Sequence, residues 1–538
     1  TSTTTTVYDA QATDAGAGND VGITYSLSGT GGARFTINAS TGVVKFVASP
    51  NFEVPTDNGA NNVYDVIVEA KDAANNTVYR NVAITVTNIN DAPTGTSNSI
   101  TIDEDGSKTF AASDFGFTDA TGESHTLSAV IITTLPTAGT LTLSGTAVTL
   151  NQSIAVANLG SLVYSPAQNA NGNAYATIGF KVQDNGGTAN GGADTSVNAN
   201  TLTFNVTGVN DAPVVNTATA LSLAGVSEDA GVPSGSSAGT AVSELFAAIT
   251  DADVGHTKSV AITGVNSNGK LYFSADGGSS WQEVTTTLSE SNALHLDGNS
   301  RVYFRPNANW NGTLSDAIQF RAWDQTSMAI IGSTSAVGTT GGSGAYSTAV
   351  GSVGITVTAV NDAPVNTVPV AQSTNEDTNK VITGLSITDV DAGSSTMTVT
   401  LGMTNGTLTL LSGAGVTITG NNSTSVTLSG TVTNINALLA TANAVTYVPT
   451  ANYNGSATLT MTTSDGTLSD TDTVAITVAS VNDAPTGTNT TITLAEDGSK
   501  TFAASDFGCA DAADSPANRL SAVIITTLPT AGTLTLSG

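Results

Sequence analysis

The sequence predicts an all-β protein built as a tandem array of β-sandwiches. The tetrapeptide Asn-Asp-Ala-Pro occurs four times, at 90–93, 210–213, 361–364 and 482–485. Its copies are separated by domain-sized steps of about 120 to 150 residues, which indicates an array and not one large globule. A strand pattern precedes every copy, and part of one repeat recurs almost word for word at the end of the chain.

The strand pattern consists of apolar residues at every second position. Such alternation predicts a strand with one buried face. The proline that follows lacks a backbone donor and biases the preceding alanine toward extended geometry, so each pattern is expected to be the last strand of a domain. The alternating residues are Val82, Ile84 and Val86; Leu202, Phe204 and Val206; Val353, Ile355 and Val357; and Val474, Ile476 and Val478.

Composition excludes several classes of protein. The chain carries 43 acidic and 14 basic residues, for a net charge of −29, so its surface repels nucleic acid and attracts cations. Hydrophobic residues make up 39% of the chain, which favours a folded array over disorder. No apolar run is long enough to span a membrane. The single cysteine, Cys509, excludes an intrachain disulfide and a cysteine zinc site.

The linkers divide the chain into five modules. Module 1 is 1–93 and lacks its first strand, module 2 is 94–213, module 3 is 214–364, module 4 is 365–485, and module 5 is 486–538. Module 5 copies part of module 2, because 104–116 is identical to 496–508 and 127–145 to 520–538. Half a sandwich exposes a core face and a strand edge, so we expect a segment of a longer repetitive polypeptide, exported by signals outside these residues.

Module 1 closely resembles a cadherin repeat. The resemblance lies in 23–27, 35–38, 41–44, 51–53 and 64–72. Asp14, in the stretch 12–14, matches the family's early calcium-ligand loop, Glu53 matches the glutamate of its Leu-Asp-Arg-Glu motif, and Asp72 matches its late Ala-x-Asp motif. Two departures are that Asn51 replaces the motif's aspartate and that the linker 88–93 is one residue shorter. Modules 2 and 4 resemble the cadherin-like tandem repeats of very large bacterial surface proteins, and module 3 resembles a longer variant. The resemblance implies Ig-like, cadherin-like sandwiches.

Acidic residues recur in step with the linkers, as an opening Glu-Asp pair, an Asp-x-Asp loop and a late aspartate. The resemblance implies that each junction holds Ca²⁺ between the opening glutamate of one module, the linker, and the loop and late aspartate of the next. The alternative is that these are solvated loop acids and turn formers. The predicted ligands are Asp14, Glu53, Asp72, Asn88, Asn90, Asp91, Glu104, Asp119, Asp184, Asn210, Asp211, Glu228, Asp251, Asp253, Asp324, Asn361, Asp362, Glu376, Asp389, Asp391, Asp465, Asn482, Asp483 and Asp511.

Enzyme motifs are missing from the sequence. There is no nucleophile elbow, phosphate loop or zinc-spaced histidine pair, so we expect no enzymatic activity. We expect His125 and His256, which follow acidic loops, to be turn residues.

Module 3 contains all three tryptophans, Trp281, Trp310 and Trp323. They are expected either in the sandwich core or on a sugar-binding platform. The stretch 272–281 predicts a hairpin, and the Gly/Ser/Thr-rich stretch 332–348 predicts a flexible loop.

Together these observations predict a calcium-stiffened structural or adhesive segment of a large bacterial cell-surface or extracellular filament protein. Its partners would be other copies of itself, neighbouring repeats, cell-surface glycans or other cells, with no nucleic acid and no direct membrane insertion. Polysaccharide binding centred on 214–364 is the alternative function. A third possibility is self-assembly, in which another chain supplies the strand missing before Thr1.

Overall fold

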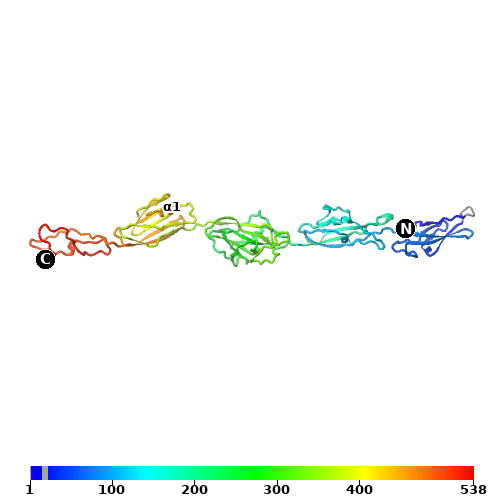
Figure 1. Ribbon diagram of the computed structural model, residues 1–538, viewed down its shortest axis with the longest axis horizontal. Helices are drawn as coiled ribbons and strands as arrows, with labels where there is room; N and C mark the ends of the chain where they lie inside the picture. Colours follow the sequence, from blue (N-terminus) through cyan, green and yellow to red (C-terminus); the bar gives the residue numbers. More distant parts are fainter. Residues whose placement is uncertain (1, 15–21, 538) are drawn as a thin grey trace.

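The computed structural model describes residues 2–14 and 22–537. Its modules lie end to end in an extended row (Figure 1). Modules 1 to 4 each contain two main β-sheets with a hydrophobic core of their own. The protein is therefore all-β and built as a tandem array of β-sandwiches, as the sequence predicts. No helix among the described residues is long and apolar enough to cross a membrane.

Module 1 has two three-stranded sheets. Phe35, Phe46, Tyr64 and Val66, which come from both sheets, are buried between them. The sheets have the orders β1-β4-β3 and β2-β5-β6, with β1 Tyr8–Asp9, β4 Val43–Phe46, β3 Phe35–Ile37, β2 Thr24–Ser28, β5 Val63–Lys71 and β6 Thr77–Thr85, and the 3-10 turn η1 is Gly32–Arg34.

Module 2 packs a five-stranded sheet on a four-stranded one. The rings of Phe115 and Phe180 pack edge to face in this core, with their centroids 5.0 Å apart. The larger sheet has the order β12-β9-β14-β15-β7, with Ser153–Ala155, Leu127–Thr134, Gly172–Asp184, Asn200–Thr207 and Asn98–Asp103. The smaller has the order β11-β10-β13-β8, with Thr146–Ala147, Thr140–Leu143, Leu162–Ser165 and Lys108–Thr109, and the 3-10 turns are η2 Ala112–Phe115, η3 Val156–Ser161 and η4 Ala189–Gly191.

Module 3 packs a six-stranded sheet on a four-stranded one. The larger sheet has the order β17-β27-β25-β20-β23-β26, with Val226–Ser227, Gly351–Thr358, Gly312–Trp323, Ser259–Val265, Ala293–Leu296 and Thr334–Ser335. The smaller has the order β18-β24-β21-β22, with Thr240–Ala241, Arg301–Pro306, Gly269–Ser274 and Gln282–Glu283. β16 Val214–Val215 pairs with β19 Ile249–Thr250, and η5 is Val242–Ala248. The pairing of β21 with β22 confirms the predicted hairpin.

Most of 332–348 is a loop, as predicted, but the loop is packed against the module and is not free. Strand β26 within it pairs with β23, and Tyr346 is 1% exposed. The Tyr346 ring stacks on Trp323 and its hydroxyl lies 3.0 Å from His295 Nε2. One buried aromatic side chain therefore anchors a stretch whose composition is otherwise typical of a loop.

Module 4 packs a six-stranded sheet on a three-stranded one. The larger sheet has the order β29-β38-β37-β32-β35-β34, with Gln372–Asn375, Ser469–Ala479, Gly455–Ser464, Met397–Met403, Ser425–Gly430 and Val416–Thr419. The smaller has the order β30-β36-β33, with Lys380–Ile382, Val445–Pro449 and Gly406–Leu410. β28 Val365–Thr367 pairs with β31 Ser386–Thr388, and α1 Val432–Leu439 carries Ile435, Leu438 and Leu439 into the core.

The described part of 486–538 contains only the 3-10 turn η6, Ala504–Phe507, and an isolated bridge between Thr486 and Ala510. Leu494 and Ile524 are exposed there, as expected for a partial sandwich.

The predicted last strands of modules 1 to 4 are β6, β15, β27 and β38. In modules 2 to 4, the opening strand runs parallel to the last strand and pairs with it, which brings the Glu-Asp pair to the end where the linker leaves. In module 1, β6 pairs only with β5 among the described residues. The sheet topology therefore places the opening Glu-Asp pairs of modules 2 to 4 at the module ends.

Candidate metal sites at the module junctions

Each linker aspartate donates its backbone amide to an acid in the first loop of the following module. The acceptors are Glu123 Oε2 for Asp91 (3.1 Å), Asp253 Oδ2 for Asp211 (2.7 Å), Asp391 Oδ2 for Asp362 (2.6 Å) and Asp514 Oδ1 for Asp483 (3.0 Å). This contact recurs at all four junctions and fixes the loop against the linker.

The linker asparagine contacts the late aspartate at three junctions. Its Nδ2 group donates to Asp184 from Asn90 (3.0 Å), to Asp324 from Asn210 (2.9 Å) and to Asp465 from Asn361 (2.6 Å). Because the amide nitrogen of each asparagine donates to the late aspartate, the carbonyl oxygen of the same amide faces away from that carboxylate. Asn90 Oδ1 and Asn210 Oδ1 are buried and accept no hydrogen bond from the described residues.

The opening glutamate of the preceding module reaches the linker from the other side. Val209, Val360 and Val481 donate their backbone amides to Oε1 of Glu104, Glu228 and Glu376 at 2.8, 2.6 and 2.7 Å. All three glutamates are less than 5% exposed. A nearly buried carboxylate is costly unless its second oxygen is also neutralised or hydrogen-bonded.

The junctions hold a concentration of buried side-chain oxygens that no described group satisfies. Buried polar atoms without a partner are rare in folded proteins, so their recurrence at one kind of place indicates a missing ligand. They are Glu53 Oε1, Asn88 Oδ1, Asn90 Oδ1, Asp119 Oδ1, Asn210 Oδ1, Asp211 Oδ2, Asp362 Oδ2, Glu376 Oε2, Asp389 Oδ2, Asp483 Oδ2 and Asp511 Oδ1.

Three of the linker aspartates lie among other carboxylates that repel their charge. Burial raises the pKa of Asp211, Asp362 and Asp483, and neighbouring carboxylates raise each of these pKa values further. At every one of these junctions the neighbours include both acids of the opening pair, such as Glu104 and Asp105 beside Asp211. A divalent cation would remove this repulsion.

Oxygen atoms from both modules converge closely enough to share an ion. The carboxylate oxygens of Glu104, Asp211 and Asp253 lie within 4.8 Å of one another, as do those of Glu376, Asp483 and Asp514. Carboxylate and amide oxygens are the ligands that calcium prefers. The residues therefore fit a hard divalent cation, which would bridge two modules at each of these junctions.

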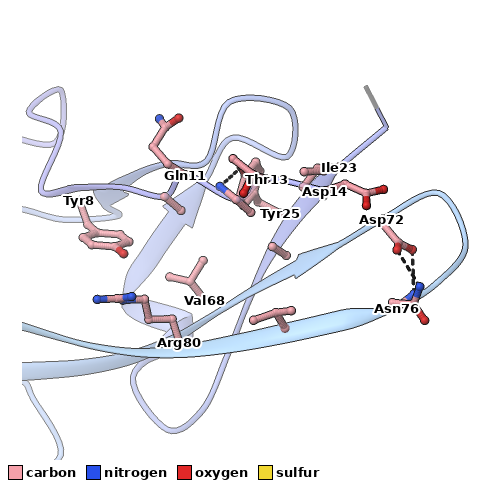
Figure 2. A pocket seen from close by; sticks show the side chains of 14 residues that line it. Tyr8, Gln11, Thr13, Asp14, Ile23, Tyr25, Val68, Asp72, Asn76 and Arg80 are labelled. Carbon is pink, nitrogen blue, oxygen red and sulfur yellow. Dashed lines mark hydrogen bonds between the residues drawn. The ribbon is translucent and has the colours of Figure 1, made fainter. Parts of the chain in front are cut away.

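The structure brings most predicted ligands together, including all six of junction 3–4: Glu228, Asn361, Asp362, Asp389, Asp391 and Asp465. At junction 1–2, Glu53 of module 1 lies against Gly122 of module 2, and Asn88 Nδ2 donates to Glu123 Oε1 (2.6 Å). Asp14 and Asp72 lie apart from these junctions, at a pocket of about 390 Å³ within module 1 (Figure 2).

Glu123 and Asp514 are not among the predicted ligands, although each takes the place of the second loop aspartate and the sequence already places Asp514 with Asp511 in the stretched counterpart of the Asp-x-Asp loop. Both stand further from the first acid than in the Asp-x-Asp spacing of Asp251 and Asp253. The signal that could have found them is the alignment of module 2 with module 5, in which both loops are longer. Asp105, Asp229 and Asp377 were also left out, and each lies beside a linker aspartate.

The three tryptophans do not form one sugar-binding surface. Trp323 is 1% exposed inside module 3, so it is a core residue and is removed from the glycan candidates. Trp310 packs against the main core of the module. Trp281 is half-buried, with its ring edge-to-face to Tyr303 and its indole nitrogen 3.3 Å from Gly235 O.

No protein-family model and no curated protein sequence matches this chain. Solved structures of cadherin tandem extracellular domains are similar to it at low identity. Domains 1–5 of protocadherin gamma B2 match with a TM-score of 0.36 and 15% identity, covering 86% of this chain and 74% of that one. Mouse cadherin-23 EC22-24 matches with a TM-score of 0.35 and 15% identity, covering 73% and 100%. Drosophila N-cadherin EC1-4 matches with a TM-score of 0.25 and 13% identity, covering 89% and 95%.

Proposed function

We propose that this chain is a calcium-stiffened structural or adhesive segment of a large bacterial cell-surface or extracellular filament protein. The observation that carries the proposal is the recurrence, at four junctions, of buried oxygens without partners around a linker aspartate. A protein of this kind spans distance between cells, surfaces or subunits and catalyses no reaction. Its partners would be further copies of the chain, neighbouring repeats, cell-surface glycans or other cells.

The mechanical role follows from where the acids lie. The linker is a short stretch of backbone between two rigid sandwiches, and carboxylates from both sandwiches face it. Without a cation their repulsion opposes close approach of the two module ends. A bound Ca²⁺ ion would supply positive charge, and carboxylates from both module ends would serve as its oxygen ligands, which would hold the two ends in one orientation.

Each group at a junction has a defined part in this scheme. The opening glutamate and the linker aspartate would hold the ion from the preceding module and the linker. The loop acids would hold it from the following module, and the late aspartate orients the linker asparagine through its amide nitrogen. Because ordering a flexible linker is part of the binding equilibrium, calcium affinity and junction stiffness are linked.

Calcium titration calorimetry on the whole chain tests the proposal. We expect saturable, stoichiometric binding that falls when the linker aspartates Asp211 and Asp362 are replaced by asparagine, with the melting of the sandwiches in chelator unchanged or slightly raised. Absence of binding at millimolar calcium would reduce the linkers to ordinary turns, because extracellular calcium sites bind in the range of about 10⁻⁴ to 10⁻³ M.

A further inference from the structure

Junctions 1–2 and 2–3 differ from the other two junctions in one donor atom, a histidine ring nitrogen beside the loop acids. The described residues leave the buried nitrogen of junction 1–2 without a hydrogen-bond partner. Loop residues Asp119, Glu123 and His125 of module 2 place a carboxylate oxygen, a second carboxylate oxygen and an imidazole nitrogen within 4.8 Å of one another. His125 Nδ1 lies 3.7 Å from Asp119 Oδ2 and 3.8 Å from Glu123 Oε2. These distances exceed hydrogen-bonding range, and the nitrogen is buried without a hydrogen-bond partner among the described residues.

A second, independent observation points into the same cluster. Asn90 is 8% exposed, and its Oδ1 atom accepts no hydrogen bond from the described residues. A Cβ atom placed on Gly186 would lie 1.9 Å from Asn90 Oδ1 and 2.7 Å from His125 Cε1. The amide oxygen and the imidazole ring therefore face the same glycine and lie close to each other.

The cluster is held in place by hydrogen bonds that leave Asp119 Oδ1, His125 Nδ1 and Asn90 Oδ1 without a partner among the described residues. The His125 backbone amide donates to Asp119 Oδ2 (2.7 Å), and Asp91 and Asn88 both donate to Glu123. The side chain of Glu123 is fully buried. Asn90 is held through its nitrogen by Asp184 (3.0 Å). Preorganised ligands of this kind lose little entropy on binding a cation.

We propose that Asp119, Glu123, His125 and Asn90 form a mixed nitrogen–oxygen site for a first-row divalent cation of the Zn²⁺ class. Calcium takes oxygen ligands almost exclusively, whereas Zn²⁺ and its neighbours favour an imidazole nitrogen combined with carboxylates. The site would make junction 1–2 respond to a cation that the all-oxygen junctions 3–4 and 4–5 bind more weakly. Cation binding at this site does not depend on calcium binding at the other junctions.

The chain contains its own control for this proposal. Asn518 is the counterpart of His125 in the copied segment, because it stands two residues before the identical run that starts at Leu127 and at Leu520. The Asn518 backbone amide likewise donates to the first loop acid, Asp511 Oδ2 (2.8 Å). The substitution His125→Asn therefore installs a residue that this loop already accommodates, so we expect it to fold.

Histidine-selective NMR on the whole chain provides the test. The parent protein is His256→Asn, because His256 Nδ1 lies 3.4 Å from Asp253 Oδ2 in the corresponding loop of module 3 and would add a second imidazole. Two histidine signals then remain, from His125 and from His295. His295 is 0% exposed and serves as the internal reference for an unchanged fold.

In chelator-treated protein, one equivalent of Zn²⁺ is expected to shift the His125 signal and leave the His295 signal in place. The double variant His125→Asn/His256→Asn is expected to bind Zn²⁺ about tenfold more weakly or worse by calorimetry. An unmoved His125 signal in a sample that still binds Ca²⁺ would overturn this proposal alone and make His125 an ion-pair partner of the two acids. A shifted His125 signal without Ca²⁺ binding would support it and contradict the calcium role.

Discussion

Junctions 1–2 and 3–4 make the same contacts with different residues. In junction 3–4 the second loop acid is Asp391, two residues after Asp389, and it accepts the amide of Asp362 at 2.6 Å. In junction 1–2 the same position is taken by Glu123, four residues after Asp119. The longer glutamate side chain fits a loop with two additional residues.

This difference shows that the junction depends on contact geometry and not on the Asp-x-Asp motif. The backbone amide of a linker aspartate needs an acceptor, and a carboxylate from either residue type can provide it. The longer loop also brings a histidine into the cluster, where junction 3–4 has no imidazole among the residues that surround Asp362.

The largest expected effect is the loss of calcium affinity when one carboxylate is removed at junction 3–4. Asp362→Asn keeps the shape of the side chain but removes a charge whose raised pKa shows it to be strained. Calorimetry should show calcium affinity at this junction reduced by about 100-fold or more, since even indirect ligands cost 10- to 100-fold. In chelator the same variant should melt at an equal or higher temperature.

Glu290→Gln is the matched control, because Glu290 is half-exposed and pairs with Arg321 away from any junction. An equal loss of calcium binding in this variant would show that overall charge and not the site controls binding.

The next largest effect is expected on cation affinity at junction 1–2, after substitution of Glu123. Glu123→Ala removes the acceptor for both Asp91 and Asn88, so cation affinity at this junction should fall by about 10- to 100-fold. Glu123→Asp should recover part of the loss only if the loop can move closer. Titrations of the two variants beside the unaltered chain measure this, and identical isotherms for all three would contradict the role assigned to Glu123.

A smaller effect is expected from Gly186→Ala. The added methyl group would overlap Asn90 Oδ1 and displace the linker asparagine, at a cost of about 1–3 kcal/mol in the stability of module 2. Gly160→Ala is the control, because no atom lies within 4 Å of the new Cβ there. Thermal melting should separate the two, and equal melting temperatures would show that the Asn90 side chain is mobile.

The smallest expected effect is the dependence of the folding stability of the metal-free chain on pH. The pKa values of Asp211, Asp362 and Asp483 are raised in the folded state, so folded protein holds their protons more tightly than unfolded protein. Stability in chelator should therefore fall as the pH rises through these raised values. Below about pH 4 the trend should reverse, because Glu228 and Asp465 have lowered pKa values and lose their hydrogen-bonded anionic forms.

Melting curves between pH 4 and 7, recorded in chelator and in calcium, measure this effect. In calcium the dependence should be opposite, since the ion competes with the same protons. Burial lowers the pKa of His295, which adds a rise in stability with pH, so the test is the difference in stability between the unaltered chain and Asp362→Asn in chelator. The unaltered chain should lose stability relative to the variant as the pH rises, and a difference that stays constant or changes the other way would contradict the repulsion assigned to Asp362.

Much of the fold follows from the sequence because alternating apolar residues determine which face of a strand is buried. The pattern Leu202, Phe204, Val206 predicts β15, and all three residues are buried. The order at 332–348 could not be predicted, because it depends on the packing of Tyr346 against Trp323, which are distant in sequence.

The junction acids were predictable where spacing matched a known pattern, as for Asp389 and Asp391. Glu123 was not, because its loop is longer and only the folded chain shows that this acid reaches the linker amide. The engagement of the asparagine nitrogens by the late aspartates, which leaves the amide oxygens free, is also a property of the assembled ends.

Small-angle scattering of the whole chain, in calcium and then in excess chelator, tests the central claim most directly. If cations lock the junctions, the calcium profile should be that of an extended, stiff rod, and removal of calcium should shorten the maximum dimension and add flexibility. Superimposable profiles in the two conditions would contradict the account, because the junction carboxylates would then have no influence on how the modules are held.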